Sequence, residues 1–568
     1  MNRFPDSLPA LELKGRSPSW STGAICLIAA CVLVGLWLRV RGLSAEGFAD
    51  DEVHKWLAAN RYLIGDFGGD DIEHPMLMKW LIAACLAIGP HFSWKPETMV
   101  RLPNAVAGAV SIIVVAQLGR RLFGRTAALW AAGLAAVSTT FIGYQRVAKE
   151  DTLLGLFLMV VLWCCAEAKA AADDLRTRDQ KRWEWLGAAS LGAMLASKYF
   201  FFFAPIPVVF YFWVLGTGTR WQIPFTRWLA LTGGALLVFA ALNWTPFLPS
   251  NWEYGASYLA EKKTIHGSLF FMGKLYHNLP SWWLKGTPPW FYLVFASVKL
   301  APPTVIAAFG GLCLALWQRR PAHRLLLSWM GTWFLILSAS GSKWGRFFTS
   351  VLPAFLLLAG YFSAQICAWI KRFRLPRAAI ASVAGLLTVL LVGTEAAAAV
   401  EYGPHYRFYI SALGGGERNL DWFFPHCDYF DAGFREAVAY VAAHAEPNAE
   451  LSTEIDLPAQ FYAEQFGRKD LLHTLVRRGE SCQRGRICYL IVQTGRLYFL
   501  NRDALQNLSG RQPWHTVSLR GHEVIKVYRL EPGESPFPAA RSTQSLPPKS
   551  SGSGWNPVFG IELLEGVQ

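Results

Sequence analysis

The sequence predicts an all-α polytopic membrane domain of about 11 transmembrane helices, followed by a small α/β domain outside the membrane. Of the 568 residues, 53% are hydrophobic and only 17% are charged, proportions outside the range of ordinary soluble domains. The mean hydropathy of +0.25 indicates the same class. The chain also contains 25 Trp and 37 Phe, residues that concentrate where membrane spans meet the headgroup region.

Eleven apolar runs are candidates for crossing the hydrocarbon core, which takes about 20 residues of helix. They lie near residues 22–40, 102–118, 126–143, 152–168, 183–197, 200–216, 227–246, 288–317, 323–340, 347–370 and 378–397. We expect residues 1–398 to form the membrane domain.

Basic residues fall in short clusters between these runs and predict the topology, because Lys and Arg resist translocation. Five clusters occupy alternate connections, near residues 120–125, 169–182, 220–227, 319–324 and 371–377. A cytoplasmic N-terminus places all of them on one side of the membrane. The formal net charge of +14 is therefore a topology signal and does not indicate nucleic-acid binding.

The first outward loop, residues 41–100, contains a semi-apolar stretch at 75–89 that predicts a helix lying at the membrane interface. A re-entrant segment is the alternative. After residue 398 the hydropathy falls, and residues 399–531 predict an extracytoplasmic α/β domain with a helix near 432–445 and strands near 488–493 and 515–530.

Two features of the C-terminal region concern its chemistry and order. Residues 532–568, rich in Pro, Ser and Gly, predict a disordered tail. Cys482 and Cys488 could close a short disulfide in an oxidising compartment, or they could be free thiols.

Ionisable residues gather at the outward ends of the predicted spans. They are Asp50, Asp51, Glu52, His54, Lys55, Asp70, Asp71, Glu73, His74 and Lys79 in the first loop, Arg146, Lys149, Glu150 and Asp151 at a second tip, and Lys198, Lys343 and Arg346 at two further corners. Each has an ordinary explanation as a solvated loop residue, an interface anchor or, for Asp151, a helix N-cap. Together they outline an outward pocket with both signs of charge, which suits a lipid phosphate.

These residues resemble a known family, the polyprenyl-phosphate-sugar glycosyltransferases of the C type (GT-C), glycosyltransferase family 39. It includes protein O-mannosyltransferases and lipid A aminoarabinose transferases. The likeness spans roughly residues 20–435 and rests on Asp51-Glu52, Glu73-His74-Pro75 with Lys79, Arg101-Leu102-Pro103, Arg146 with Asp151, and Lys343 with Arg346. The chain departs from the commoner His-Pro-Pro-Leu at Met76.

The resemblance implies a glycosyltransferase of the bacterial inner membrane that moves a sugar from a polyprenyl-phosphate donor to an acceptor hydroxyl on the extracytoplasmic face. Asp51 would act as general base in an inverting displacement, with Glu52 and Asp151 as further catalytic residues. Cations would stabilise the leaving phosphate. They are His74, Lys79, Arg101, Lys198, Lys343 and Arg346.

No cofactor is expected on this basis, because the cations can stabilise the leaving phosphate without a metal. Some C-type transferases do use a divalent ion, and Asp50, Asp51, Glu52 and Asp151 offer carboxylate ligands for one. The donor sugar remains open, and the acceptor could be a lipid, a glycan or a protein.

A polytopic transporter or lipid-linked glycan flippase is the main alternative function. It predicts ionisable residues at mid-bilayer and repeats between the two halves of the chain, and neither is evident in the sequence. A membrane scaffold is a third alternative, but it leaves the outward carboxylates and cations unexplained.

Overall fold

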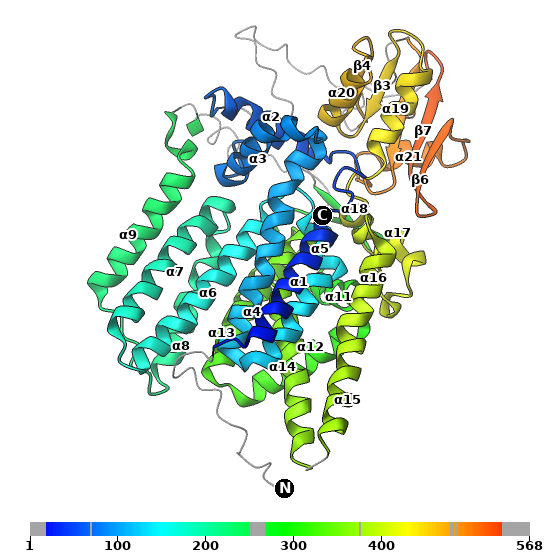
Figure 1. The fold of residues 1–568 in the computed structure, drawn as a ribbon. Coiled ribbons are helices and arrows are strands. Elements are labelled where there is room, and N and C mark those ends of the chain that lie inside the picture. Colours follow the sequence, from blue (N-terminus) through cyan, green and yellow to red (C-terminus); the bar gives the residue numbers. More distant parts are fainter. Residues whose placement is uncertain are drawn as a thin grey trace.

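The computed structural model describes residues 19–68, 71–249, 251–252, 267–373, 376–476, 482, 485–534 and 536. The predicted tail at 532–568 lies almost entirely outside the described residues. Figure 1 shows a bundle of helices with a smaller α/β unit at one end. We call residues 431–530 the C-terminal unit.

Helices dominate the bundle. In the first half they are α1 (Thr22–Val40), α2 (Asp50–Leu63), α3 (Met76–Ile88), α4 (Pro96–Val137), α5 (Thr139–Gln145), α6 (Asp151–Asp173), α7 (Thr177–Ser197), α8 (Pro205–Leu215) and α9 (Phe225–Leu242). A hairpin follows, β1 (Ser268–Phe271) with β2 (Lys274–His277). The remaining helices are α11 (Phe291–Lys299), α12 (Pro302–Gln318), α13 (Pro321–Ala339), α14 (Leu352–Lys371), α15 (Arg377–Thr388), α16 (Thr394–Tyr402), α17 (Leu420–Phe423) and α18 (Pro425–Tyr429).

The predicted helical membrane domain is confirmed in character, although not in its number of spans. Within the described ranges, six helices are long and apolar enough to cross a membrane: α1, α4, α6, α9, α14 and the stretch from Arg377 to Tyr402. α8 and α12 lie in shorter apolar helices. All eleven predicted runs are largely helical, but eleven separate long spans are not found among the described residues. Several of these helices are too short or too polar, and the runs 102–118 and 126–143 both fall largely in α4, which is kinked at Gly124 and counted once.

The prediction of one continuous run over residues 288–317 is wrong. The chain leaves helical geometry at Leu300 and Ala301, which are extended, and α12 begins at Pro302. A proline lacks the N–H that a continuing helix needs and disfavours a helical residue before it. α11 and α12 are therefore separate helices.

The first loop forms two helices, α2 and α3, at the end of the bundle that carries the C-terminal unit (Figure 1). An aromatic contact packs one against the other, with the ring centroids of Tyr62 and Trp80 5.5 Å apart. The helix expected over residues 75–89 is present as α3. Its position at a membrane interface remains a prediction.

The C-terminal unit contains a mixed five-stranded sheet, as expected. Its strands are β3 (Glu450–Thr453), β4 (Leu472–Leu475), β5 (Cys488–Gln493), β6 (His515–Leu519) and β7 (His522–Leu530), in the order β4-β3-β5-β7-β6. β3 is parallel to β4 and β5, whereas β7 is antiparallel to β5 and β6. Its helices are α19 (Phe434–His444), α20 (Asp456–Gln465) and α21 (Arg502–Leu508).

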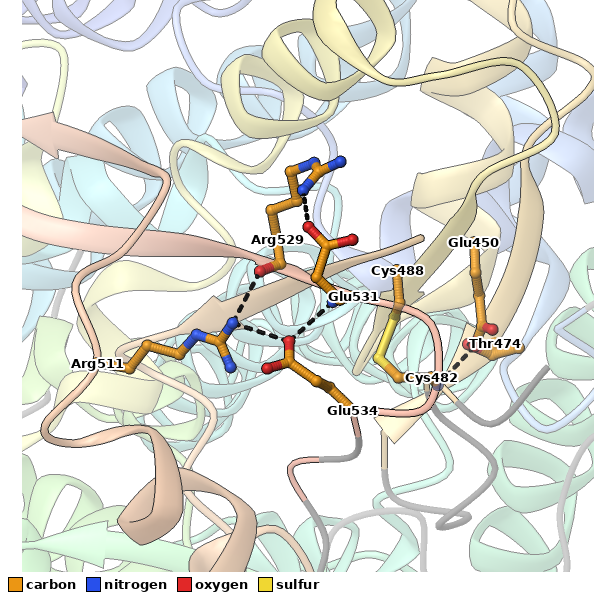
Figure 2. Close-up of a disulfide and its surroundings, with 8 residues drawn as sticks. All are labelled: Glu450, Thr474, Cys482, Cys488, Arg511, Arg529, Glu531 and Glu534. Atoms are coloured by element: carbon orange, nitrogen blue, oxygen red, sulfur yellow. Dashed lines mark hydrogen bonds and ion pairs between the residues drawn. A yellow bond between two sulfur atoms is a disulfide. The ribbon is translucent and has the colours of Figure 1, made fainter. Parts of the chain in front are cut away.

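Cys482 and Cys488 are joined by a disulfide. Figure 2 shows this bond beside Glu450 and Thr474. The buried Glu450 carboxylate accepts hydrogen bonds from Thr474 Oγ1 at 2.6 Å and from the Cys482 N–H at 2.7 Å. The disulfide therefore joins Cys482 to the first residue of β5, the central strand of the sheet.

The bundle and the C-terminal unit share one hydrophobic core. Phe48, just before α2, is fully buried; its ring lies 5.3 Å from that of Phe461, and its N–H donates to the Tyr462 hydroxyl at 2.6 Å. The first loop and the C-terminal unit are thus held as one body.

Candidate functional site

Asp51 lies in the first turn of α2, where its carboxylate forms an ion pair with Lys149. The Asp51 side chain keeps 34% of its surface exposed, whereas Lys149 is buried. Burial alone would raise the pKa of Asp51, but the charges of Lys149, Arg346 and Lys55 outweigh it and hold this pKa well below its usual range. Asp51 is therefore an ionised carboxylate that remains open to solvent.

Asp151 is the first residue of α6 and pairs with two predicted residues from separate corners, Lys198 and Arg346. Its Oδ1 lies 2.6 Å from Lys198 Nζ, and its Oδ2 lies 3.8 Å from Arg346 Nε. Lys198 follows the end of α7, and Arg346 lies in the connection from α13 to α14. Burial lowers the pKa of Lys198 to about 8, opposed by the charge of Asp151.

Aromatic rings support both cations. The Lys198 ammonium lies 4.4 Å from the ring centroid of Phe347, and the Arg346 guanidinium lies 4.9 Å from that of Trp344. Such contacts stabilise a cation without neutralising its charge. Lys198 and Arg346 share the single carboxylate of Asp151, so this group of three residues keeps a net positive charge when Lys198 is protonated.

A second ionic cluster surrounds Lys55, a residue of the charged first loop to which the sequence assigned no role. Its ammonium lies 2.8 Å from Glu150 Oε1 and 3.3 Å from Asp71 Oδ2. His74 Nδ1 lies 2.7 Å from Asp71 Oδ1, and Lys79 Nζ donates to the carbonyls of Asp71 and His74 at 2.5 and 2.9 Å. The predicted His74 and Lys79 thus share one cluster, although Lys79 is buried and engaged with backbone.

Asp71, His74 and Glu150 have ligand atoms close enough to hold a metal ion, all within 4.8 Å of one another. The ammonium of Lys55 already lies against both carboxylates, so it supplies the positive charge that a metal would. Elsewhere in the described chain, one further such group contains Glu450 with the disulfide-bonded Cys482 and Cys488. A disulfide offers no thiolate ligand.

Glu52 and Arg101 form a buried pair with two hydrogen bonds, at 2.9 and 2.6 Å. The same guanidinium donates to the carbonyls of Leu43, Glu46 and Gly47. An Arg side chain has five N–H donors, and all five are used in this way. Glu52 also accepts from two backbone N–H groups, so the pair fixes the chain before α2.

Lys343 and Arg146, at two other corners, are also engaged with backbone. The Lys343 ammonium donates to the Ser340 carbonyl, and the side chain is fully buried, which lowers its pKa to about 8. Arg146 donates to four carbonyls at the end of α1, those of Leu38, Arg39, Arg41 and Gly42. Arg146 therefore caps a helix.

Lys55, Asp71, Lys149 and Glu150 belong to the charged clusters seen in the sequence, but sequence reasoning gave none of them a catalytic or phosphate-binding role. One signal was available for Lys55, because it lies one helical turn after Asp51 and so shares a face with it. Asp71 precedes His74 by three residues. The partner of Lys149 had no local signal, since Asp51 belongs to a distant helix.

Comparison with known proteins gives two findings. Residues 73–244 match the family described as dolichyl-phosphate-mannose-protein mannosyltransferase. No curated protein matches the chain.

Solved structures of ArnT from Cupriavidus metallidurans are similar to the whole fold. The apo form matches with 15% identity and a TM-score of 0.54, and the form bound to undecaprenyl phosphate with 16% identity and a TM-score of 0.50. Each match covers 89% of this chain and 98% of ArnT. The resemblance to these glycosyltransferases is therefore confirmed: residues 73–244 match the mannosyltransferase family, and the chain has an ArnT-like GT-C fold.

Proposed function

We propose that this protein is a membrane glycosyltransferase that transfers a sugar from a polyprenyl-phosphate donor to an acceptor hydroxyl on the extracytoplasmic face. The observation that carries the proposal is the partly exposed, ionised Asp51 beside the cations Lys55, Lys149 and Arg346, which come from three separate connections. The family match over residues 73–244 and the ArnT-like fold support it. ArnT itself has been solved with undecaprenyl phosphate.

The reaction is a single displacement at the anomeric carbon. The acceptor oxygen forms the new bond while the bond from that carbon to the phosphate oxygen breaks, and the electron pair leaves with the phosphate. Asp51 takes the proton of the acceptor hydroxyl. Attack opposite the leaving group inverts the anomeric carbon.

Donor binding prepares Asp51 for this role. Lys149 and Arg346 both hold the pKa of Asp51 low, and a bound phosphate would attract these same cations. As they turn to the phosphate, the pKa of Asp51 rises, and a carboxylate with a higher pKa is a stronger base. The proton therefore moves only when the donor is in place.

The other predicted site residues divide into two groups. Asp151, Lys198 and Arg346 are proposed to face the donor, with His74 next to them through Glu150. Glu52, Arg101 and Lys79 are proposed to position the loop. Arg101 and Lys79 donate to backbone carbonyls, and Glu52 pairs with Arg101. Lys343 is also assigned to the donor group, because its ammonium donates to a backbone carbonyl and that contact leaves part of its positive charge available.

An extracytoplasmic location is proposed for the site and the C-terminal unit. Disulfides persist in oxidising compartments such as the bacterial periplasm, and Cys482 is bonded to Cys488. The inner membrane of a bacterium is the setting that fits this disulfide and the charge pattern of the connections.

A transporter is less well supported. Its hallmark would be an ionisable residue inside a span that is available to a substrate. Glu395 lies in such a stretch, but it is fully buried and its Oε1 accepts a hydrogen bond from the Ala301 N–H at 3.0 Å. This carboxylate therefore caps the start of α12.

The test combines cells and purified protein. Loss of the gene should cause one polyprenyl-phosphate sugar to accumulate, detected by mass spectrometry of membrane lipids. Purified protein should consume that same sugar from a panel of undecaprenyl-phosphate donors carrying mannose, galactose, 4-amino-4-deoxyarabinose or N-acetylglucosamine. The proposal is contradicted if no polyprenyl-phosphate sugar accumulates in the cells and the purified protein consumes none of these donors.

Asp51→Asn should lower turnover by about 10²- to 10⁴-fold, the usual contribution of a general base. Asp66→Asn is the matched control, because Asp66 lies in the same loop with half of its side chain exposed. Normal turnover by the Asp51 variant would exclude Asp51 as the base.

A further inference from the structure

The start of α2 is held by the C-terminal unit. The N–H of Asp50, the first residue of α2, donates to Asp431 Oδ2 at 3.1 Å. The Asp50 carboxylate lies 3.9 Å from Arg496 Nη2. Asp51 is the next residue, so these contacts act within one residue of the proposed base.

Asp431 and Arg496 form a buried bidentate pair. Arg496 Nε donates to Asp431 Oδ1 at 2.6 Å and Nη2 to Oδ2 at 2.7 Å. Gln493 Nε2 donates to the same carboxylate at 2.7 Å, and Arg496 Nη1 donates to the Tyr498 hydroxyl. Both charged side chains are at least nine-tenths buried. Paired contacts of this kind fix direction as well as distance.

The backbone around Asp431 is strained. Phe430 and Asp431 have φ values of +44° and +65°, and Gly433 follows at +84°. Non-glycine residues rarely adopt this region and keep it only where their surroundings impose it. The left-handed turn aims the Asp431 carboxylate at the start of α2.

Gln493 and Arg496 lie at the carboxyl end of β5, the end of a parallel strand where α/β domains usually bind ligands. β3 and β5 are parallel, and such sheets bind their ligands at the carboxyl ends of the strands. Gln493 ends β5, and Arg496 follows it. A small pocket at this edge is lined by both residues and by His426, Tyr429 and Asp431.

Within that pocket, Gln493 Oε1 is buried and has no hydrogen-bond partner in the described structure. This end of the sheet therefore contacts the start of α2 through Asp431 and Arg496 and keeps one buried acceptor without a hydrogen bond in the described structure.

We propose that Asp431 and Arg496 are positioning residues, through which the C-terminal unit sets the direction of Asp51 toward the acceptor hydroxyl. This inference rests on the proposed transferase function. Without the pair, the first turn of α2 loses the acceptor of its Asp50 N–H and the charge that faces the Asp50 carboxylate. Asp51 then reaches the acceptor less often, although the donor site is unchanged.

The test uses Arg496→Gln, Arg496→Lys and Asp431→Asn in the full chain. Arg511→Gln is the matched control, since Arg511 pairs with Glu534 at an exposed part of the C-terminal unit (Figure 2). Hydrogen exchange is followed at the amides of residues 49–53 and, separately, in the outer sheet. Affinity for undecaprenyl phosphate is measured alongside turnover of the donor identified from the panel above.

In Arg496→Gln, exchange at residues 49–53 should quicken while exchange in the sheet stays normal. Turnover should fall about 10- to 100-fold, as expected for a misplaced catalytic group, with undecaprenyl phosphate affinity within about twofold. Arg496→Lys should recover part of the turnover, because it restores the charge but not the bidentate geometry.

Unchanged turnover with unchanged exchange in Arg496→Gln would overturn the inference. A fall in turnover without quicker exchange at residues 49–53 would overturn it as well. If Arg496→Gln disturbs the sheet itself, Asp431→Asn and Arg496→Lys carry the same criteria. A wild-type protein that consumes no donor would instead contradict the proposed function.

Discussion

Replacing Arg101 separates two roles for this residue. Sequence resemblance implies that Arg101 binds the donor phosphate, whereas its contacts with Glu52 and three carbonyls indicate that it holds the first loop. In Arg101→Gln, the amide can supply at most two of the five N–H donors. The fully buried Glu52 carboxylate then lacks its cation.

Removing one partner of a buried pair usually costs about 3–5 kcal/mol, which lowers the ratio of folded to unfolded protein more than about 100-fold. Thermal unfolding in detergent, followed by tryptophan fluorescence, should show a much lower midpoint for Arg101→Gln. The exposed pair of Arg511 and Glu534 is the control, because loss of such a pair costs about 1 kcal/mol or less.

Binding of undecaprenyl phosphate to the folded fraction should be nearly normal in Arg101→Gln. A variant with the wild-type unfolding midpoint that no longer binds undecaprenyl phosphate would refute the structural role. It would restore Arg101 to the donor-binding group.

Three further predictions concern topology, pH and the disulfide. A cysteine in place of Ile64, which is 82% exposed in the first loop, should react with an impermeant maleimide added from outside. A cysteine in place of Leu175, which is 68% exposed between α6 and α7, should react only after the cytoplasmic side is opened. The reverse result would contradict the predicted topology. Undecaprenyl phosphate should bind more weakly at pH 9 than at pH 7, because Lys198, with its pKa lowered to about 8, is charged below that pH and neutral above it. If the affinity of Lys198→Arg falls as steeply between pH 7 and pH 9, Lys198 is not the cause. Replacing Cys482 and Cys488 with serine should destabilise the C-terminal unit by roughly 2 kcal/mol, because their disulfide closes a short loop. Unchanged hydrogen exchange in the sheet of this variant would contradict the prediction.

Apolar length predicted the helices well, because it reflects a demand of the membrane on each segment separately. The division between α11 and α12 was missed because hydropathy remains high across Leu300 and Ala301. The signal was nevertheless local, in Pro302 and Pro303. Backbone geometry therefore corrected what hydropathy alone could not resolve.

The structure brings together several charged residues that the sequence grouped, but it pairs them in ways that the sequence could not predict. Asp51, Asp151, Lys198 and Arg346 could be grouped because the outward ends of successive spans lie at similar depth. Their individual partners depend on how the helices pack, which no local pattern records.

Burial was the other unknown for the charged residues. Glu52 neighbours Asp51 in sequence, yet it is fully buried while Asp51 is half-open. On a helix, neighbouring residues point about 100° apart, so one can face the packed interior while the next faces solvent. Sequence alone shows that both residues are acidic and lie in the same loop, but it does not show which of them is buried.

The shared core of the first loop and the C-terminal unit has a consequence for how the protein is made. Phe48 and its partner Tyr462 are 414 residues apart, and Asp50 and Asp431 are 381 apart. At roughly 5–20 residues per second, α2 leaves the ribosome about 20–80 s before its partners exist. During that interval α2 lacks the contacts to Tyr462 and Asp431 that hold its start. Under the proposed function, the nascent chain would transfer sugar slowly, and full turnover would begin only when residues 431–530 have packed against the first loop.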